Sequence, residues 1–391
     1  MIFLICIALL VNMDSIVYFF EIPYQLVEMG GTQEAVSMLN VIHAVVYVVS
    51  SGISSGKITK DRHNNNLIWL LVICLSSVYT ATCFAASPGW IYGFVAMHGL
   101  LAGVFWSAFW SAFYRVLAQD PIKISTLTIL SALCSVIGPF VAGKLYIVFG
   151  KYVLLLFSGL LIIALILNKP MDQMTQRLRK AGRKNMQKDS FLLYRIESWA
   201  EPRDAMRISA VLWSGMVIAG YLEGVFRSAM AIYLMKYDIG SDIWGILQSV
   251  KLLSQTAVII LIRMVGEEKV VFSKTKVKIT IGMGCFAMGA LLMVFTKSIP
   301  VMILSMILLG IGYGVVYFLC MCIGTRLTGL AGKNLNGIAE CLTGLGILLG
   351  SAVSGIHQGN PYYIFLCLAI AGITVTQTVY KKTIWKESNS K

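Results

Sequence analysis

The sequence predicts an all-α integral membrane protein with twelve transmembrane helices in two six-helix halves. Three observations predict this class. Hydrophobic residues make up 58% of the chain and charged residues only 13%, whereas a soluble domain carries about 25% charged residues. Apolar runs recur along the whole chain, each long enough to cross the ~30 Å hydrocarbon layer, which takes about 20 residues. One long polar and basic stretch then divides these runs into six and six.

The first half is expected over residues 1–168. Its first run starts at Met1 and lacks both a basic leading region and a cleavage site before Asp14. It is therefore interpreted as a membrane helix and not as a signal peptide, with a missing or very short cytoplasmic tail before it. The six apolar runs of this half are 1–26, 36–57, 67–87, 89–116, 122–149 and 151–168.

The second half is expected over residues 206–391, where the last run is followed by a short basic tail. Its runs are 206–236, 240–264, 277–296, 298–326, 335–356 and 361–380. Between the halves, residues 169–205 form a basic linker that is expected to meet anionic lipid headgroups. Its part from Ser190 to Pro202 is typical of an amphipathic interfacial helix, which Ser190 caps and Pro202 follows.

The distribution of basic residues predicts the topology. With the N-terminus in the cytoplasm, 26 of the 32 Lys and Arg residues fall in the linker, the tail and the loops on the inner side. Cytoplasmic loops of membrane proteins carry such an excess. We therefore expect a multi-pass protein of the cell membrane with both termini and the linker in the cytoplasm. The same placement explains the net charge of +14 without a nucleic-acid partner.

The sequence contains no recognisable motif for cofactor binding or for enzyme catalysis. The nine cysteines lie in or beside apolar runs and show no metal-ligand spacing, so they are interpreted as small core residues. No phosphate-binding GxxxxGK[ST] loop, HExxH or GxSxG element is present. The sequence therefore predicts neither an enzyme nor a nucleotide-driven pump, and no metal or other cofactor.

Three local patterns point to one family. Asp14 stands nine residues before Pro23 in the first run. Asp61 and Arg62 lie in the loop after the second run, GKITKDRHNNN. The fifth run contains Gly138, Pro139 and Gly143 in SVIGPFVAGKLYIVFG, where small residues permit close helix approach and a proline bends the helix. These patterns and the paired halves resemble the major facilitator superfamily, and its drug antiporters in particular.

The resemblance covers nearly the whole chain, but two motifs depart from the family pattern. In the signature loop, Asn64, Asn65 and Asn66 replace a glycine and a basic pair, so the family's conformational latch is incomplete here. In the fourth run, the drug exporters carry an intramembrane arginine, whereas this chain has His98 as its nearest polar group. The proton-relay role of that arginine is therefore not transferred.

Ionisable residues within apolar runs give the candidate site. Asp14, Glu223, Arg227 and Lys251 fall near the middle of their runs, where an unpaired charge costs roughly 2.5–3.5 kcal/mol. They must therefore pair or face a water-filled cavity. Glu223 and Arg227 are four residues apart on one helix face and are able to satisfy each other, so an internal ion pair is the alternative to a role in binding.

Weaker candidates for substrate contact are His98, Trp106 and Tyr317, each of which also has a plain packing interpretation. The resemblance implies a central site lined by the first, fourth, seventh and tenth segments. Aligning Gly31 with Gly240, an offset of 209 residues, superimposes Asp14 on Glu223. We therefore hypothesise that these two acids face each other across the cavity and bind a proton or a cationic group, with Arg227 and Lys251 tuning them.

The resemblance implies a secondary active transporter that moves a small-molecule substrate by alternating access. Proton coupling is expected because acids lie at membrane depth, and proton-coupled efflux by antiport is slightly favoured. The alternatives are a proton-coupled uptake symporter and a non-transporting sensor or assembly factor on the same scaffold. We expect a monomer whose partners are the solute, protons and membrane lipid.

Overall fold

The computed structural model describes residues 2–58, 64–117, 121–167, 202–237, 239–265, 275–295, 298–331, 335–356 and 362–374. Its elements are all helical over these ranges. The first half contains α1 (Ile2–Glu28), α2 (Gln33–Ile58), α3 (Asn64–Cys83), α4 (Pro88–Leu117), α5 (Pro121–Phe149), the short η1 (Gly150–Tyr152) and α6 (Val153–Leu167).

The second half begins after the long stretch that the structure does not describe. It contains α9 (Pro202–Val225), the π-helical turn η2 (Phe226–Met230), α10 (Ala231–Met235), α11 (Ser241–Val265), α13 (Thr275–Phe295), α14 (Ile299–Ala331), α15 (Leu335–Ile356) and a final helix at Tyr362–Thr374. The α9, η2 and α10 segments follow one another without a break and together correspond to the seventh predicted run.

Prolines mark several helix starts. Pro88, Pro121 and Pro202 each occupy the first position of a helix, where the missing N–H is not needed and the fixed φ is already helical. Pro202, which is expected to follow an amphipathic linker helix, begins α9, so α9 starts inside the predicted linker. The expected linker helix before it lies outside the described residues, as do Asp61 and Arg62 of the signature loop.

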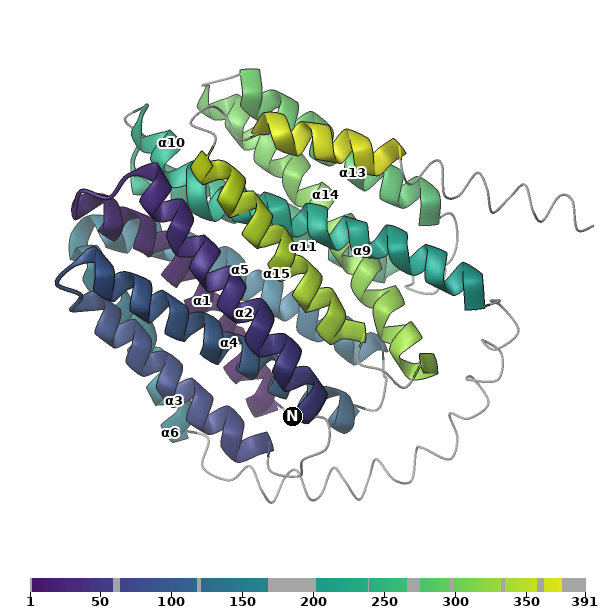
Figure 1. Cartoon of the computed structure of the whole chain (residues 1–391), viewed down its shortest axis with the longest axis horizontal. Helices are drawn as coiled ribbons and strands as arrows, with labels where there is room; N and C mark the ends of the chain where they lie inside the picture. Colours follow the sequence, from purple (N-terminus) through teal and green to yellow (C-terminus); the bar gives the residue numbers. More distant parts are fainter. Residues whose placement is uncertain are drawn as a thin grey trace, which may run out of the picture.

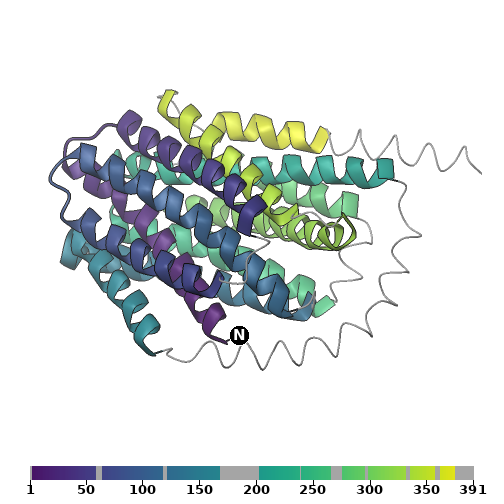
Figure 2. The same ribbon diagram turned by 60° about the horizontal axis from the view of Figure 1, so that its bottom comes forward.

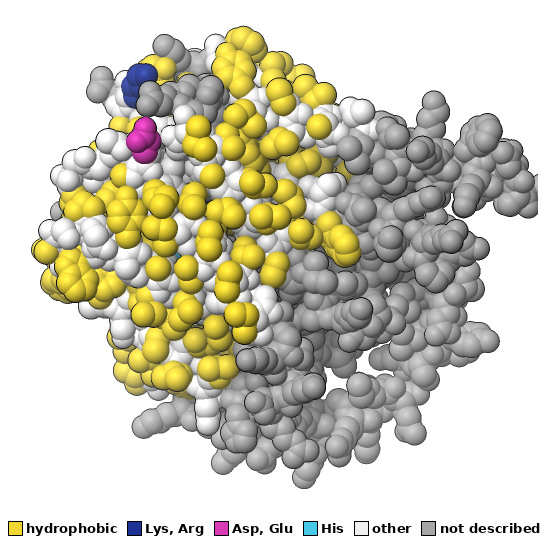
Figure 3. Space-filling model, viewed as in Figure 1, with side chains coloured by type: hydrophobic (Ala, Val, Ile, Leu, Met, Phe, Trp, Pro, Cys, Tyr) yellow, Lys and Arg dark blue, Asp and Glu magenta, His cyan; other side chains and the backbone are white. Residues whose placement is uncertain are grey.

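The described helices confirm the membrane class. Nine candidate spans are long and apolar enough to cross a bilayer, and one of them, Ile129–Ile166, covers both α5 and α6. Two shorter apolar helices, Cys341–Ile356 and Tyr362–Thr374, follow near the end. Together they fit the twelve predicted spans. In Figure 3 apolar side chains are spread over the whole described part of this face, and the charged side chains that it shows lie at its upper left edge. Large residues such as Ile147 and Ile166, each 65% exposed, suit contact with lipid tails.

The helices alternate in direction, so the bundle has two distinct ends. We call the "hairpin end" the one that holds the described turns at 29–32 and 84–87, which lie at the left in Figure 1. We call the "linker end" the opposite one, where α6 ends and α9 begins. Figure 2 shows the first half and the second half side by side, with their helices running in similar directions.

The two halves pack in a pseudo-symmetric way. Within the first half α2 packs on α4 and α1 on α5, and in the second half the corresponding pairs are α11 on α14 and α9 on α15. Between the halves the main contacts are α5 with α11 and α2 with α15. Exchanging the halves converts one of these contacts into the other. This symmetry leaves α1, α4, α9 and α14 to surround the centre.

Candidate functional site

A cavity of about 260 Å³ lies between the two halves. Its α1 wall runs from Ala8 to Phe19, and its α5 wall comprises Ser131, Ala132 and Ser135. Both stretches lie around the middle of their helices. The second half contributes residues of α9, η2, α11, α14 and α15. The cavity therefore occupies the centre of the bundle.

The hairpin end is closed between the halves. Pro139 and Gly143 of α5 lie against α11, where a Cβ on Gly143 would come within 2.7 Å of the Ser241 carbonyl oxygen and a Cβ on Gly245 within 2.5 Å of the Pro139 carbonyl oxygen. Ser249 Oγ also donates to the Val136 carbonyl at 2.8 Å. The absence of side chains on the two glycines permits this approach, so Pro139 and Gly143 of the fifth-segment motif lie at an interface between the halves.

Gly138 has a different neighbour from the other two motif residues. A Cβ there would meet Met13 Cγ at 3.1 Å and Val17 Cγ2 at 3.3 Å, both on α1. Gly138 therefore belongs to the α1–α5 contact inside the first half, whereas Pro139 and Gly143 form the contact with α11. The sequence motif combines two separate packing functions on adjacent faces of one helix.

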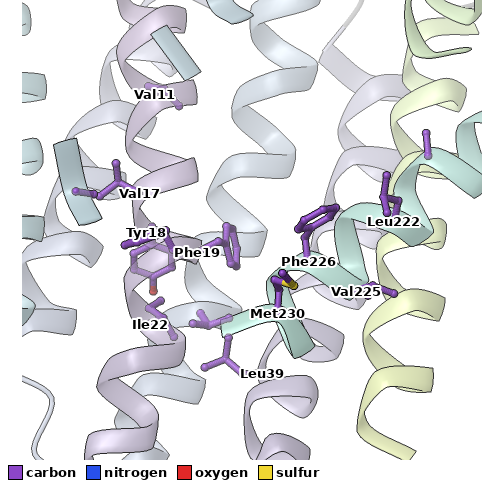
Figure 4. Packing of buried hydrophobic residues seen from close by; sticks show 14 of the residues in the cluster. Val11, Val17, Tyr18, Phe19, Ile22, Leu39, Leu222, Val225, Phe226 and Met230 are labelled. Atoms are coloured by element: carbon purple, nitrogen blue, oxygen red, sulfur yellow. The ribbon is translucent and has the colours of Figure 1, made fainter. Parts of the chain in front are cut away.

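An aromatic layer lies between the cavity and the hairpin end. Phe20 of α1 stacks on Trp244 of α11 with ring centroids 6.4 Å apart, and Trp244 stacks on Phe226 of η2 at 5.8 Å. Figure 4 shows Phe19 of α1 and Phe226 of η2 on facing helices of the two halves, with Met230 close by. These rings come from both halves, so any opening at the hairpin end must separate them.

Glu223 is the centre of an ion cluster at the cavity wall. Its Oε2 accepts from Lys251 Nζ at 2.8 Å and its Oε1 accepts from Arg227 Nε at 3.3 Å. Lys251 is 1% exposed, and its ammonium lies 4.1 Å from the centroid of the Phe226 ring. The Arg227 guanidinium lies 4.3 Å from the ring centroid of Phe19 on the other half. These three charged groups and two rings thus join α1, α9, η2 and α11.

Glu223 and Arg227 line the cavity, but Lys251 does not. The π-helical turn begins at Phe226 and carries Arg227, and such turns often occur at functional sites. The Arg227 carbonyl oxygen also accepts from Asn40 Nδ2 of α2 at 3.2 Å. The internal ion pair predicted as the alternative is therefore present, and it is enlarged by Lys251 into a three-residue cluster that still faces the cavity.

A hydrogen-bonded chain runs through the first half from α1 to α2. Ser15 Oγ lies 3.4 Å from Tyr79 Oη, Tyr79 Oη lies 3.2 Å from His98 Nε2, and His98 Nδ1 lies 3.1 Å from His43 Nε2. Ser15, His43 and His98 line the cavity, and Tyr79 lies behind them. His98 is therefore a cavity residue, as expected, and its hydrogen-bond partners identify Tyr79 as a buried link.

Asp14 lies on the opposite side of α1 from the cavity. It is 1% exposed, and neither carboxyl oxygen has a hydrogen-bond partner in the described part of the chain. It does not belong to the cavity lining. The expectation that Asp14 and Glu223 face each other across the cavity is wrong for this conformation, because the residues of α1 that face it are Asn12, Ser15 and Phe19.

Glu21 is a second buried acid that the sequence interpretation did not propose. It is 1% exposed and, like Asp14, has no hydrogen-bond partner among the described residues. It lies seven residues after Asp14 on the same face of α1. The available signal was an acid inside an apolar run just before Pro23.

The remaining cavity wall is aromatic and polar. Trp106 of α4 and Tyr317 of α14 line the cavity as expected, and Tyr317 stacks with Tyr313 at 5.3 Å. The sequence interpretation missed a polar group in which Asn12 Nδ2 donates to Ser135 Oγ at 2.5 Å and to Ser131 Oγ at 3.0 Å. Single amides and hydroxyls in apolar runs are too common to be recognised without the fold.

Comparison with known proteins agrees with this architecture. The nucleoside transporter NupG has a similar structure, with a TM-score of 0.68 and 12% sequence identity, over 97% of this chain and 98% of that chain. A point mutant of NupG gives a TM-score of 0.63 and 13% identity with the same coverage. Such low identity shows the fold alone. No curated protein sequence matches the chain significantly.

The family is established by a match to the Major Facilitator Superfamily over residues 3–355, which is most of the chain. It agrees with the paired halves, the central cavity and the fifth-segment glycines described above. The chain is therefore a member of the major facilitator superfamily, a multi-pass membrane protein with the fold of a secondary transporter.

Proposed function

We propose that this protein moves a small solute across the membrane by alternating access through the central cavity. The observation that carries the proposal is the position of this cavity. It lies between two pseudo-symmetric halves, and a layer of rings and glycine contacts from both halves closes it on the side of the hairpin end. Rocking the halves would open that layer and expose the cavity residues to that side of the membrane.

The predicted topology assigns a direction to this conformation. With the termini and linker in the cytoplasm, the hairpin end, where the aromatic layer closes the cavity, faces outward. Gln33 Nε2 of α2 donates to the Ser354 carbonyl of α15 at 2.9 Å near the hairpin end, so both inter-half contacts contribute to the outer closure. The protein is proposed to act as a monomer in the cell membrane, with lipid around its apolar surface.

Proton coupling is proposed to use Asp14 together with the Ser15–Tyr79–His98–His43 chain. A charge at the centre of a membrane helix costs roughly 2.5–3.5 kcal/mol, and Asp14 has no described partner to offset that cost. Binding a proton removes the charge. The chain of hydroxyl and imidazole groups begins at Ser15, the residue that follows Asp14 in the sequence, and its members Ser15, His98 and His43 line the cavity. Antiport with efflux is the favoured direction, and symport with uptake is the alternative.

Reconstitution tests this function. Purified protein in proteoliposomes with an internal pH dye should acidify or alkalinise the lumen when a transported solute is added on one side. The solutes are chosen by a thermal-shift screen of the purified protein against a panel of metabolites and drugs. The panel includes uridine and adenosine because the structural neighbour NupG is a nucleoside transporter. The sign of the pH change separates antiport from symport. Stabilisation by a solute without any solute or proton flux would favour the sensor alternative.

A further inference from the structure

The ion cluster at the cavity wall has more positive than negative groups. Two cations, Lys251 and Arg227, share one carboxylate, Glu223. Lys251 makes the shorter contact, at 2.8 Å against 3.3 Å, and it is buried away from the cavity. One carboxylate balances one of these cations. The charge left over therefore belongs to Arg227, which is the member that lies on the cavity wall.

Arg227 has hydrogen-bonding capacity to spare. A guanidinium carries five N–H donors in a planar fork that fits carboxylate and phosphoryl oxygens. Only Nε–H has an acceptor within the described part of the protein, on Glu223. The Phe19 ring holds one face of the guanidinium plane at 4.3 Å, which fixes its orientation and leaves the terminal N–H groups without a described protein acceptor.

The rest of the lining also favours a negative group. Glu223 is the only acid on the cavity wall in the part of the chain that the structure describes, and both of its oxygens are already engaged. His43 Nδ1 is buried at this wall and has no hydrogen-bond partner among described residues. Asp14 and Glu21 lie outside the lining. A cationic solute would therefore find no free carboxylate here.

We propose that the cavity binds a small organic anion, whose carboxylate or phosphoryl group pairs with the free side of the Arg227 guanidinium. Phe19, Trp106, Tyr313 and Tyr317 supply ring surfaces for a planar or apolar body of the same molecule. This assignment rests on the proposed transport function and names its substrate class. It replaces the cationic solute expected from the sequence, because Lys251 and Arg227 occupy the carboxylate that would have received it.

Matched probes test the charge preference directly. The full-length protein in detergent is titrated with benzoate, benzamide and benzylamine, with indole-3-acetate, indole-3-acetamide and tryptamine, and with phenyl phosphate. Binding is measured from the concentration dependence of the melting temperature. The two carboxylates or phenyl phosphate should stabilise the protein, whereas the amides and amines should not. Comparison of benzoate with phenyl phosphate distinguishes carboxylate from phosphoryl recognition.

Variants then assign the preference to Arg227. Arg227→Gln should weaken anion binding about 10- to 100-fold, the value of one charged hydrogen-bonded contact, and Arg227→Lys should have an intermediate effect because it keeps the charge without the fork. Lys144→Gln removes a cation from an exposed position outside the cavity and should leave binding unchanged. Phe19→Leu keeps the Arg227 guanidinium but removes the ring that packs on it, so this variant should also weaken anion binding. It replaces Arg227→Gln in the test if that variant does not fold.

The outcomes separate this inference from the transport function. Any of three results would overturn the anion assignment. The amides or amines bind as tightly as the anions, or none of the seven probes binds, or the selectivity for anions is unchanged in both Arg227→Gln and Phe19→Leu. Proton-linked transport of a neutral or cationic solute would leave the function intact while this inference fails. Anion binding lost in Arg227→Gln, without flux in proteoliposomes, would support the site and refute transport.

Discussion

Replacing Glu223 by Gln should destabilise the protein more than replacing Lys251 by Met. The Glu223–Lys251 contact of 2.8 Å corresponds to about 6 kcal/mol of Coulomb attraction at an effective dielectric constant of about 20, although the desolvation of both groups offsets much of it. Glu223→Gln leaves the 1% exposed ammonium of Lys251 beside Arg227 without a counter-ion. Loss of one partner of a buried pair costs about 3–5 kcal/mol.

Lys251→Met has a smaller expected cost, because Glu223 keeps its contact with Arg227 and its side chain is 16% exposed at the cavity. We expect about 1–3 kcal/mol, within the range for a lost charged hydrogen bond. The double variant removes both charges of the buried contact. It should therefore be more stable than Glu223→Gln alone, with a coupling energy of about 2–4 kcal/mol between the two sites.

The assay is unfolding of the four proteins in mixed micelles of dodecyl maltoside and sodium dodecyl sulfate, followed by tryptophan fluorescence. The double-mutant cycle isolates the pair from effects of each substitution alone. Glu34→Gln, an acid-to-amide change at an exposed position of α2, is the matched control and should be within about 0.5 kcal/mol of the wild type. Additive costs below about 1 kcal/mol for both single variants would refute a buried ion pair.

Three further predictions follow from the packing, the buried acid and the charge distribution. Gly143→Ala places a Cβ 2.7 Å from the Ser241 carbonyl oxygen, so it should destabilise the closed hairpin end by about 1–3 kcal/mol and slow transport. Gly159→Ala, where the added Cβ has open space around it, is the control and should change neither the melting temperature nor the rate of solute uptake. Asp14→Asn should abolish proton-coupled transport but preserve solute exchange in proteoliposomes, and normal proton movement over a range of pH would exclude Asp14 as the coupling group. On a cysteine-free background, an impermeant maleimide should label a cysteine at position 360 from outside intact cells and one at position 184 only after permeabilisation, and the reverse pattern would overturn the topology.

The sequence was sufficient for the fold because the bilayer restricts the alternatives. A spanning segment must satisfy its own backbone hydrogen bonds, so an apolar run of about 20 residues predicts a helix without any knowledge of its neighbours. The same constraint predicted that Asp14, Glu223, Arg227 and Lys251 must pair or face a cavity, since an unpaired charge at that depth is unfavourable. The last three form the ion cluster, whereas Asp14 has no hydrogen-bond partner among the described residues and lies outside the cavity lining. The four-residue spacing of Glu223 and Arg227 made a contact between them the alternative to a role in binding, and the structure contains this contact.

The side of each helix that faces the cavity was not accessible from the sequence. A membrane helix is apolar on its lipid face and on its packing face, so the pattern that orients a soluble amphipathic helix is largely absent. Asp14 and Asn12 are two residues apart on α1, yet Asn12 lines the cavity and Asp14 lies behind it. The rotation of α1 about its own axis decides which of these two residues faces the cavity and which is buried. Only the packing of neighbouring helices sets that rotation.

The sequence by itself determined the membrane class, the approximate helix positions and the glycine motif of α5, and it offered the pairing of Glu223 with Arg227 as one of two alternatives. Each depends on length, composition or short spacing along one chain segment. Only the tertiary structure decided that Lys251 completes the ion cluster, that Tyr79 connects Ser15 to His98, and that Gly143 meets Gly245. These contacts join residues of different helices, and their formation depends on how whole helices rotate and approach one another. Packing therefore determines which charges remain free at the cavity wall, and with them the chemistry of the solute.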